Sequence, residues 1–376
     1  MVSKARLYKE FLPYISDLKC TYNFRIFETH VHPYDVIGVV HYADYVEVSP
    51  GEFVYKKFAG QKGVEDKADL IGWLSKFDYN KYAFSLFNLA LQIIPGYENF
   101  DLEHAFSRTG VNRLLEEMDE ALVDEIVLLP VEPWLPIDHV QKIFAHQRLK
   151  LLGSVDIHRI PVQEIGKTIK HFVDDYGIIG IKLHPNMQSF LPQPSHNPSD
   201  IAEKLRLIYR TADELGLYLL FHGGPSGLAK NLNEKYGGLT QKSRNGVLTN
   251  FCDRNGKSEL LGQYKLPVVI AHLGHFGVSK LNASLVRTIL DTHESVYFDT
   301  AGAPSGSIQK FIEWGGSQRL LFGSDALYFP ILYSMYSVYK AAQKARSHEN
   351  PDEILANILG RNFEQCILKR RENEHV

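Results

Sequence analysis

Short apolar runs recur along most of this chain, and segments with helical periodicity separate nearly all of them. From Arg25 onward eight such runs read as strands rich in Val, Ile and Leu. Continuous apolar strands are typical of a parallel sheet that is covered on both faces. Eight strand–helix units in one α/β domain predict a (β/α)8 TIM barrel, with a doubly wound open sheet as the alternative. The predicted strands are one that begins at Arg25 and runs toward Pro33, followed by 126–129, 151–157, 177–185, 217–221, 267–271, 295–299 and 319–322.

The rest of the chain is arranged around this repeat. We expect a single domain over residues 1–376, with a helical or irregular lead-in over 1–24 and extra closing helices over 333–369. A helical insertion over 36–99 follows the first strand; it contains two helical patterns, 69–77 and 81–92, and many aromatic residues. Long insertions in compact domains are often lids, so this one is expected to cap a pocket. The alternative is an insertion that buries a small core of its own.

Composition excludes several classes of function. The formal net charge of −3 and the sequence pI of about 6.6 argue against a nucleic-acid partner. The three cysteines, Cys20, Cys252 and Cys366, are far apart and lack metal-binding spacing, which favours a reducing cytoplasm. The chain has neither an apolar run of about eighteen residues nor a signal-peptide core, so no membrane partner is expected. The expected partner is a small-molecule substrate, and the aromatic residues of the insertion are compatible with a homo-oligomer.

Ionisable side chains stand where the predicted strands end. In the first strand His30 and His32 flank Val31, so both imidazoles project to one side of the strand, and Pro33 stops it. Such a pair can hold a metal ion, although alone it is a weak signal. Four further residues occupy corresponding positions on later strands: Lys182 on the fourth, His222 on the fifth, His272 on the sixth and Asp325 on the eighth.

For each of these six residues taken alone, an ordinary hydrogen-bonded side chain is the simpler interpretation. Together they would meet at the carboxyl end of one barrel, which is where the active sites of such barrels lie. Several unpaired ionisable groups are costly to bury together, so their convergence calls for a shared charge, most simply a metal ion. Imidazole and carboxylate ligands without thiolate suit zinc, and they also admit manganese, iron or nickel.

The order of these motifs resembles that of the metal-dependent amidohydrolase superfamily, and within it the amidohydrolase-related branch. The similar segments are Thr29-His30-Val31-His32-Pro33, 180–185, 220–223, 271–274 and 322–325, with softer likenesses at 113–119 and 358–362. There are three departures. Glu28 replaces the more common Asp two positions before the first histidine, His275 stands where Gly is frequent, and Ala326 stands where Pro often follows the last aspartate. None of them removes a proposed ligand, but they leave the substrate open.

The resemblance implies how the histidines and the aspartate would share metal ions. His30, His32 and Asp325 would hold one ion, while His222 and His272 would either assist it or bind a second. One ion and two ions are therefore both compatible with this set of side chains, and zinc is the expected metal.

Lys182 decides between these two arrangements. In binuclear members of the superfamily the lysine of the fourth strand takes up carbon dioxide, and the resulting carbamate bridges two ions. The run Lys182-Leu183-His184 is similar to the corresponding segment of urease, in which that lysine is modified. Burial near a metal lowers the pKa of a lysine and frees its amine for this reaction. The alternative keeps Lys182 as an ammonium that binds a substrate carboxylate beside a single ion.

The implied activity is hydrolysis of a C–N or ester bond, lactones included, in a small polar molecule by a metal-activated water. Asp325 would move the proton from that water to the leaving group, and His272, if it is no ligand, would act beside the carbonyl. His184, His275 and Asp299 are expected to contact substrate, with an orienting role as the alternative for Asp299. The same branch contains non-oxidative decarboxylases of aromatic or unsaturated acids, so a lyase is the second hypothesis. A non-catalytic binding barrel is the third.

Overall fold

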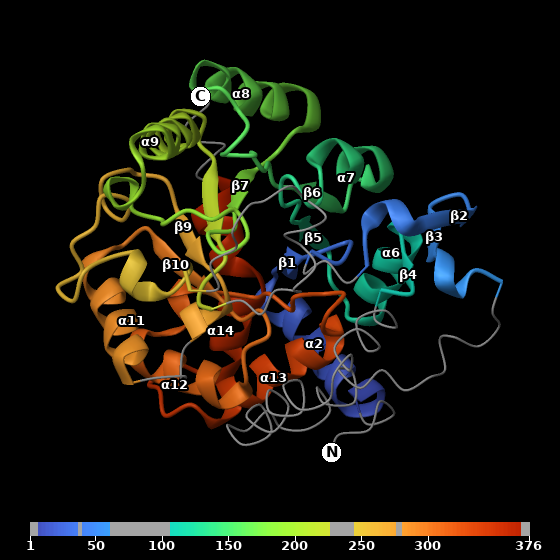
Figure 1. Cartoon of the computed structure of the whole chain (residues 1–376). Coiled ribbons are helices and arrows are strands. Elements are labelled where there is room, and N and C mark those ends of the chain that lie inside the picture. Colours follow the sequence, from blue (N-terminus) through green and yellow to red (C-terminus); the bar gives the residue numbers. More distant parts are fainter. Residues whose placement is uncertain (1–6, 37–39, 61–105, 226–243, 276–279, 370–376) are drawn as a thin grey trace, which may run out of the picture.

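The parallel strands of the molecule lie in its middle, and helices surround them (Figure 1). We describe the fold from a computed structural model in which residues 7–36, 40–60, 106–225, 244–275 and 280–369 are described. The parallel strands among these residues are β1 (Phe27–Val31), β5 (Glu125–Leu128), β6 (Leu149–Leu151), β7 (Gly180–Leu183), β8 (Tyr218–Phe221), β9 (Val268–Ile270), β10 (Val296–Asp299) and β11 (Leu320–Leu321).

These strands form two parallel sheets that are hydrogen-bonded to each other at their edges. The first has the order β1-β5-β6 and the second the order β11-β10-β9-β8-β7. Isolated parallel bridges join Val31 to Ala326 at one edge and Gly153 to Ile181 at the other. At the second edge the Lys182 N–H also donates to the Gly153 carbonyl at 2.7 Å. The carboxyl ends of β1 and β11 are therefore neighbours, although almost three hundred residues separate them in the sequence.

The helices that follow the strands bury one apolar face each. In α9, for example, Ile201, Leu205, Ile208 and Ala212 recur at helical spacing and are buried, and Gly216 follows the helix with a φ of 62°. None of the described helices is long and apolar enough to cross a membrane. The helices are α2 (Leu12–Tyr22), α6 (Val111–Glu120), α7 (Ile137–Phe144), α8 (Ile165–Tyr176), α9 (Ser199–Glu214), α11 (Lys280–Thr292), α12 (Ser305–Gly315), α13 (Ile331–Lys344) and α14 (Pro351–Ala356).

The alternation of side chains along a strand decides which residues face the site. On β7, Ile181 and Leu183 belong to the large apolar cluster that the strands share with the helices. Because successive side chains of a strand point to opposite faces, Lys182 between them points away from that cluster. On β1 the same argument turns His30 away from the cluster that holds Val31.

The mixed α/β architecture and most of the elements agree with the sequence prediction, but the third strand does not. It was predicted over 151–157, whereas β6 covers Leu149–Leu151. Val155 and Ile157 are buried in the core from the loop that follows β6. The prediction was wrong because these buried loop residues extend the apolar run past the end of the strand.

A small antiparallel sheet, which the sequence did not lead us to expect, joins the described part of the insertion to the residues just before α6. β2 (Tyr45–Ser49) and β3 (Glu52–Tyr55) form a hairpin around Gly51, whose φ is 75°, and β4 (Arg108–Thr109) pairs with β3. This sheet lies beside α6 at one side of the molecule (Figure 1). The Thr109 hydroxyl donates to the Pro33 carbonyl and so ties β4 to the segment after β1. The helices predicted over 69–77 and 81–92 lie outside the described residues.

Candidate functional site

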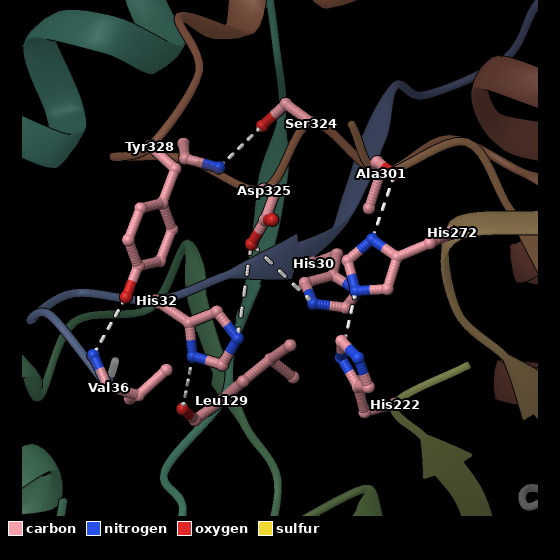
Figure 2. A network of polar contacts seen from close by, with 12 residues as sticks. His30, His32, Val36, Leu129, His222, His272, Ala301, Ser324, Asp325 and Tyr328 are labelled. Carbon is pink, nitrogen blue, oxygen red and sulfur yellow. Dashed lines mark hydrogen bonds and ion pairs between the residues drawn. The ribbon is translucent and has the colours of Figure 1, made fainter. Parts of the chain in front are cut away.

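The ends of β1 and β11 bring three candidate metal ligands together. One ligand atom from each of His30, His32 and Asp325 lies within 4.8 Å of the other two. Asp325 Oδ1 is 3.8 Å from His30 Nε2 and 4.0 Å from His32 Nε2 (Figure 2). These separations are too long for hydrogen bonds. They suit ligands of one ion, because two atoms each about 2 Å from a metal lie about 3–4 Å apart.

Hydrogen bonds on the far side of both imidazoles turn their Nε2 atoms toward this point. His32 Nδ1 lies 3.1 Å from the Leu129 carbonyl, and His30 Nδ1 lies 2.8 Å from Asp299 Oδ2. A carbonyl oxygen only accepts, so neutral His32 carries its proton on Nδ1 and presents a lone pair on Nε2. Burial lowers the pKa of both histidines well below its ordinary value and keeps them neutral. The buried His30 Nε2 has no hydrogen-bond partner, as expected of a ligand atom.

Backbone contacts hold the two ligand-bearing segments against each other. The Asp325 N–H donates to the His30 carbonyl at 3.1 Å, and Asp325 itself has a φ of 67°. One oxygen of the fully buried Glu28 accepts from the N–H groups of His30 and Ser324, both at 2.9 Å. Gly323 makes the approach possible, since a Cβ there would lie 2.9 Å from that of His30. Glu28 thus holds the backbone of the candidate ligand His30 and the backbone of Ser324, the residue before the candidate ligand Asp325.

Lys182, on β7, is fully buried. Its Nζ atom has no hydrogen-bond partner. Burial lowers the pKa of Lys182 to about 8, and the carboxylates of Asp299 and Asp325 oppose that shift. Burial also raises the pKa of Asp325 to about 7, with Lys182 opposing. The pKa values of both groups therefore lie close to neutrality.

A chain of hydrogen bonds fixes the protonation of the histidines from β8 and β9. His272 Nδ1 lies 2.9 Å from the Ala301 carbonyl, so neutral His272 carries its proton there and accepts at Nε2. His222 Nδ1, 3.1 Å from that atom, is then the donor. This leaves a lone pair on His222 Nε2, which is buried and has no hydrogen-bond partner. His184 stacks on His222 with the ring centroids 4.2 Å apart.

The segment after β9 has an unusual backbone. His272, Leu273, Gly274 and His275 all have φ values between 51° and 58°, and a Cβ on Gly274 would lie 2.6 Å from Leu248. This left-handed turn places the His275 ring 5.7 Å from that of His272. Burial lowers the pKa of His275 to about 4. Left-handed residues other than glycine are costly and cluster at functional sites.

Asp299 lies behind the histidines. Its Oδ2 bonds His30 Nδ1, while Oδ1 accepts from the N–H groups of His272 and Ala301 at 2.7 and 3.1 Å. Both oxygens are therefore occupied by the protein, and burial raises the pKa of this carboxyl. These contacts favour the orienting alternative over a substrate contact.

The structure brings all nine sequence-predicted residues to the same end of the strands, and it adds some that sequence reasoning missed. The role of Glu28 was missed, although its place before the His-x-His pair was noted. Tyr328 and Asp35, hydrogen-bonded to each other beside His32, were missed as well. Only their closeness in sequence to Asp325 and His32 could have drawn attention to them.

The amidohydrolase family model matches residues 112–362 of the chain. The chain belongs to this family. The match spans Lys182, His222, His272 and Asp325 of this amidohydrolase, whereas the His30–His32 pair precedes it and depends on the geometry given above. A search of curated proteins gives no match for the amidohydrolase.

Solved structures resemble this amidohydrolase over nearly its whole length. An uncharacterised TIM-barrel protein from Bordetella bronchiseptica has a TM-score of 0.53 at 14% identity, over 93% of this chain and 99% of that one. A 5-carboxyvanillate decarboxylase from Novosphingobium aromaticivorans, complexed with manganese and 4-hydroxy-3-methoxy-5-nitrobenzoic acid, has a TM-score of 0.51 at 14% identity, over 92% and 96%. The apo form of an IDCase from Metarhizium anisopliae has a TM-score of 0.50 at 14% identity, over 94% and 99%. At such identities the likeness concerns the fold alone.

Proposed function

We propose that this amidohydrolase is a metal-dependent hydrolase that cleaves a C–N or ester bond, lactones included, in a small polar substrate. The observation that supports it is the convergence of His30, His32 and Asp325 at ligand spacing, with the Nε2 atom of His30 buried and unpartnered. When bound there, a divalent ion supplies Lewis-acid chemistry, because it polarises a carbonyl and makes water acidic near neutral pH. Zinc is the metal we propose, with manganese, iron or nickel as alternatives.

We further propose that the two sheets form one closed (β/α)8 barrel in a single domain, with the insertion as a cap. The bridges of Val31 with Ala326 and of Gly153 with Ile181 support the closure. A closed ring explains why side chains from β1, β7, β8, β9 and β11 meet at one end of the strands.

The residues around the ligands have separate roles in the proposed reaction. Asp325, whose pKa lies near 7 because of burial, accepts the proton of the attacking water and returns it to the leaving group. Asp299 keeps His30 in the tautomer that presents Nε2. His184 and His275 lie beside His222 and His272 and are proposed to contact substrate. His272 is proposed either as a ligand through Nε2, in place of the bond from His222, or, when protonated at Nε2, as the group that polarises the carbonyl.

Lys182 has two proposed states. Its amine, with a pKa near 8, can add to carbon dioxide, releasing a proton and forming a carbamate. The carbamate and His222 would then hold a second ion, which fits the unpartnered lone pair on His222 Nε2. Native mass measurement of the intact protein, with and without bicarbonate, distinguishes the modified lysine from the free amine.

A non-oxidative decarboxylase of an aromatic or unsaturated acid is the second candidate. The unpartnered Nζ of Lys182 favours it, since an ammonium there would meet a substrate carboxylate. The manganese-bound decarboxylase of similar fold supports testing this reaction and this metal. One ion and an unmodified Lys182 are expected in this case.

The test combines metal analysis with a substrate screen. The chain is stripped with a chelator, reloaded with zinc or manganese, and assayed with lactones, amides and aryl carboxylates for acid release and for carbon dioxide release. We expect activity only in the reloaded protein, and a loss of about three orders of magnitude or more in folded Asp325→Ala. Asp200→Ala, an exposed change in the first turn of α9, is the control. A wild type that binds no divalent metal at micromolar concentration overturns the proposal in favour of a binding protein.

A further inference from the structure

Tyr328 makes contacts that the proposed reaction does not use. Its hydroxyl donates to Asp35 Oδ1 at 2.6 Å and accepts from the Val36 N–H at 2.8 Å. The other oxygen of Asp35 accepts from the Val40 N–H at 2.8 Å. Tyr328 and Asp35 each have only 5% of their surface exposed. The phenol therefore joins two segments of the chain within the interior of the protein.

These two segments carry candidate metal ligands. Asp35 lies three residues after His32, and Tyr328 lies three residues after Asp325. Between them the His32 N–H donates to the Ala326 carbonyl at 2.6 Å, and the Leu327 N–H donates to the His32 carbonyl at 3.3 Å. The bond from Tyr328 to Asp35 joins the same two segments again, just after the backbone bond between Leu327 and His32.

The ring of Tyr328 also shapes the surroundings of a ligand. It meets the His32 ring at an angle of 75° with centroids 6.1 Å apart, and its position relative to His32 can be followed in Figure 2. Phe106, two residues before β4, packs on the same ring with the centroids 4.7 Å apart. Tyr328 thus contacts the ligand His32, the segment after β1 and the residues that precede β4.

We propose that Tyr328 is a positioning residue that keeps His32 and Asp325 at ligand spacing through its bonds to Asp35 and Val36; this rests on the proposed metal site. The left-handed conformation of Asp325 persists only where its surroundings hold it. Without the hydroxyl, the buried Asp35 loses a donor and the Val36 N–H loses its acceptor, so both segments are expected to rearrange.

Tyr328→Phe tests the proposal, because it removes the hydroxyl and keeps the ring against His32 and Phe106. The readout is the affinity for zinc, measured by competition with a chromogenic chelator, together with the melting temperature of the metal-free protein. We expect the affinity to fall by about 10-fold to 100-fold, the usual effect of losing a group that orients a ligand. Asp35→Asn, which disturbs the same contact from the other side, should weaken zinc binding too. The double variant should be no weaker than Tyr328→Phe alone.

Tyr209→Phe is the matched control. The Tyr209 hydroxyl donates to the Pro192 carbonyl at 2.7 Å, and the residue is fully buried, but α9 carries none of the proposed ligands. A lower melting temperature in both variants, with zinc affinity unchanged in Tyr328→Phe, would overturn the positioning role and leave the proposed function standing. A wild type without affinity for zinc, manganese, iron or nickel would overturn both.

Discussion

Two groups of side chains in the site differ in how the protein satisfies their polar atoms. On the metal side, which comprises His30, His32 and Asp325, the protein supplies a partner behind each imidazole, namely Asp299 and the Leu129 carbonyl. The basic side comprises Lys182, His184, His222 and His272. There the imidazoles of His222 and His272 bond to each other, and the buried Lys182 Nζ and His222 Nε2 have no hydrogen-bond partner.

This difference indicates what kind of partner from outside the chain each side needs. On the metal side one cation would satisfy the unpartnered His30 Nε2 and the Asp325 carboxylate together. On the basic side a cation alone would add charge next to Lys182, so an anion must accompany it. A carbamate on Lys182 or a carboxylate on the substrate would provide that anion. The metal side is therefore expected to bind its ion before anything occupies the basic side.

The largest expected effect comes from removing one histidine from each side. His30→Ala should lose the bound metal and lower kcat/KM by about three orders of magnitude or more. It removes a ligand whose Nε2 atom is already directed at the ion by the bond from Nδ1 to Asp299. His222→Ala should retain one ion per chain, whatever its activity. Elemental analysis of the desalted variants gives the metal content, and the substrate found in the screen gives kcat/KM.

The control for these two variants is His171→Ala, since His171 is exposed on the outer side of α8. It should match the wild type in metal content and activity. Complete loss of metal from His222→Ala would show that the two sides form one indivisible site, and the comparison would fail.

A smaller effect is expected from the group behind the metal side. Asp299→Asn keeps an oxygen for the His272 N–H but removes the negative charge behind His30. Metal affinity should fall by about 10-fold to 100-fold, because the His30 tautomer is no longer fixed. The measurement is chelator competition, with retained ellipticity as evidence of folding.

Asp253→Asn is the matched control for this change. Asp253 also accepts two backbone N–H groups, from Asn255 and Lys257, but lies in an exposed turn. An Asp299→Asn protein whose metal affinity lies within about twofold of the wild type would remove the orienting role and revive a substrate contact for Asp299.

Periodicity and order in the sequence were enough to predict most of the strands and the residues at their ends. His30, Lys182 and Asp325 could be found because each follows an apolar run whose direction in a parallel sheet is known. The predicted strand boundaries were wrong where loop residues are buried, as at Val155, because a buried loop has apolar residues just as a strand does. The hairpin at Gly51 was missed since its two strands are only partly buried.

The sequence did not show which group lies behind which ligand, although an orienting role was one of the two predicted for Asp299. Tyr328 and Asp35 are 293 residues apart, and Asp299 and His30 are 269 apart. Neither pair has a spacing or a periodicity that distinguishes it from other tyrosines and aspartates. Such contacts depend on the register of the strands and the course of the loops, which a pattern of residue types does not specify.

The smallest expected effect concerns Lys182 in the metal-free protein. Burial lowers its pKa from about 10.5 to about 8, so between these values the unfolded chain holds a proton that the folded chain has released. The free energy of unfolding should therefore rise with pH in that window, by about 1.4 kcal/mol per pH unit at most. Below pH 8 this slope is absent, because both states hold the proton, and the cost of burying the charged amine is present in full. Lys182→Met lacks this amine. The free energy of unfolding in urea is therefore measured for wild type and Lys182→Met at pH 8, 9 and 10, and the difference between the two proteins gives the contribution of Lys182.

Lys204→Met, which removes a buried lysine bonded to the Ile157 carbonyl, is the control. Parallel curves for wild type and Lys182→Met would mean that the folded protein keeps the proton on Lys182, so that the basic side is compensated after all.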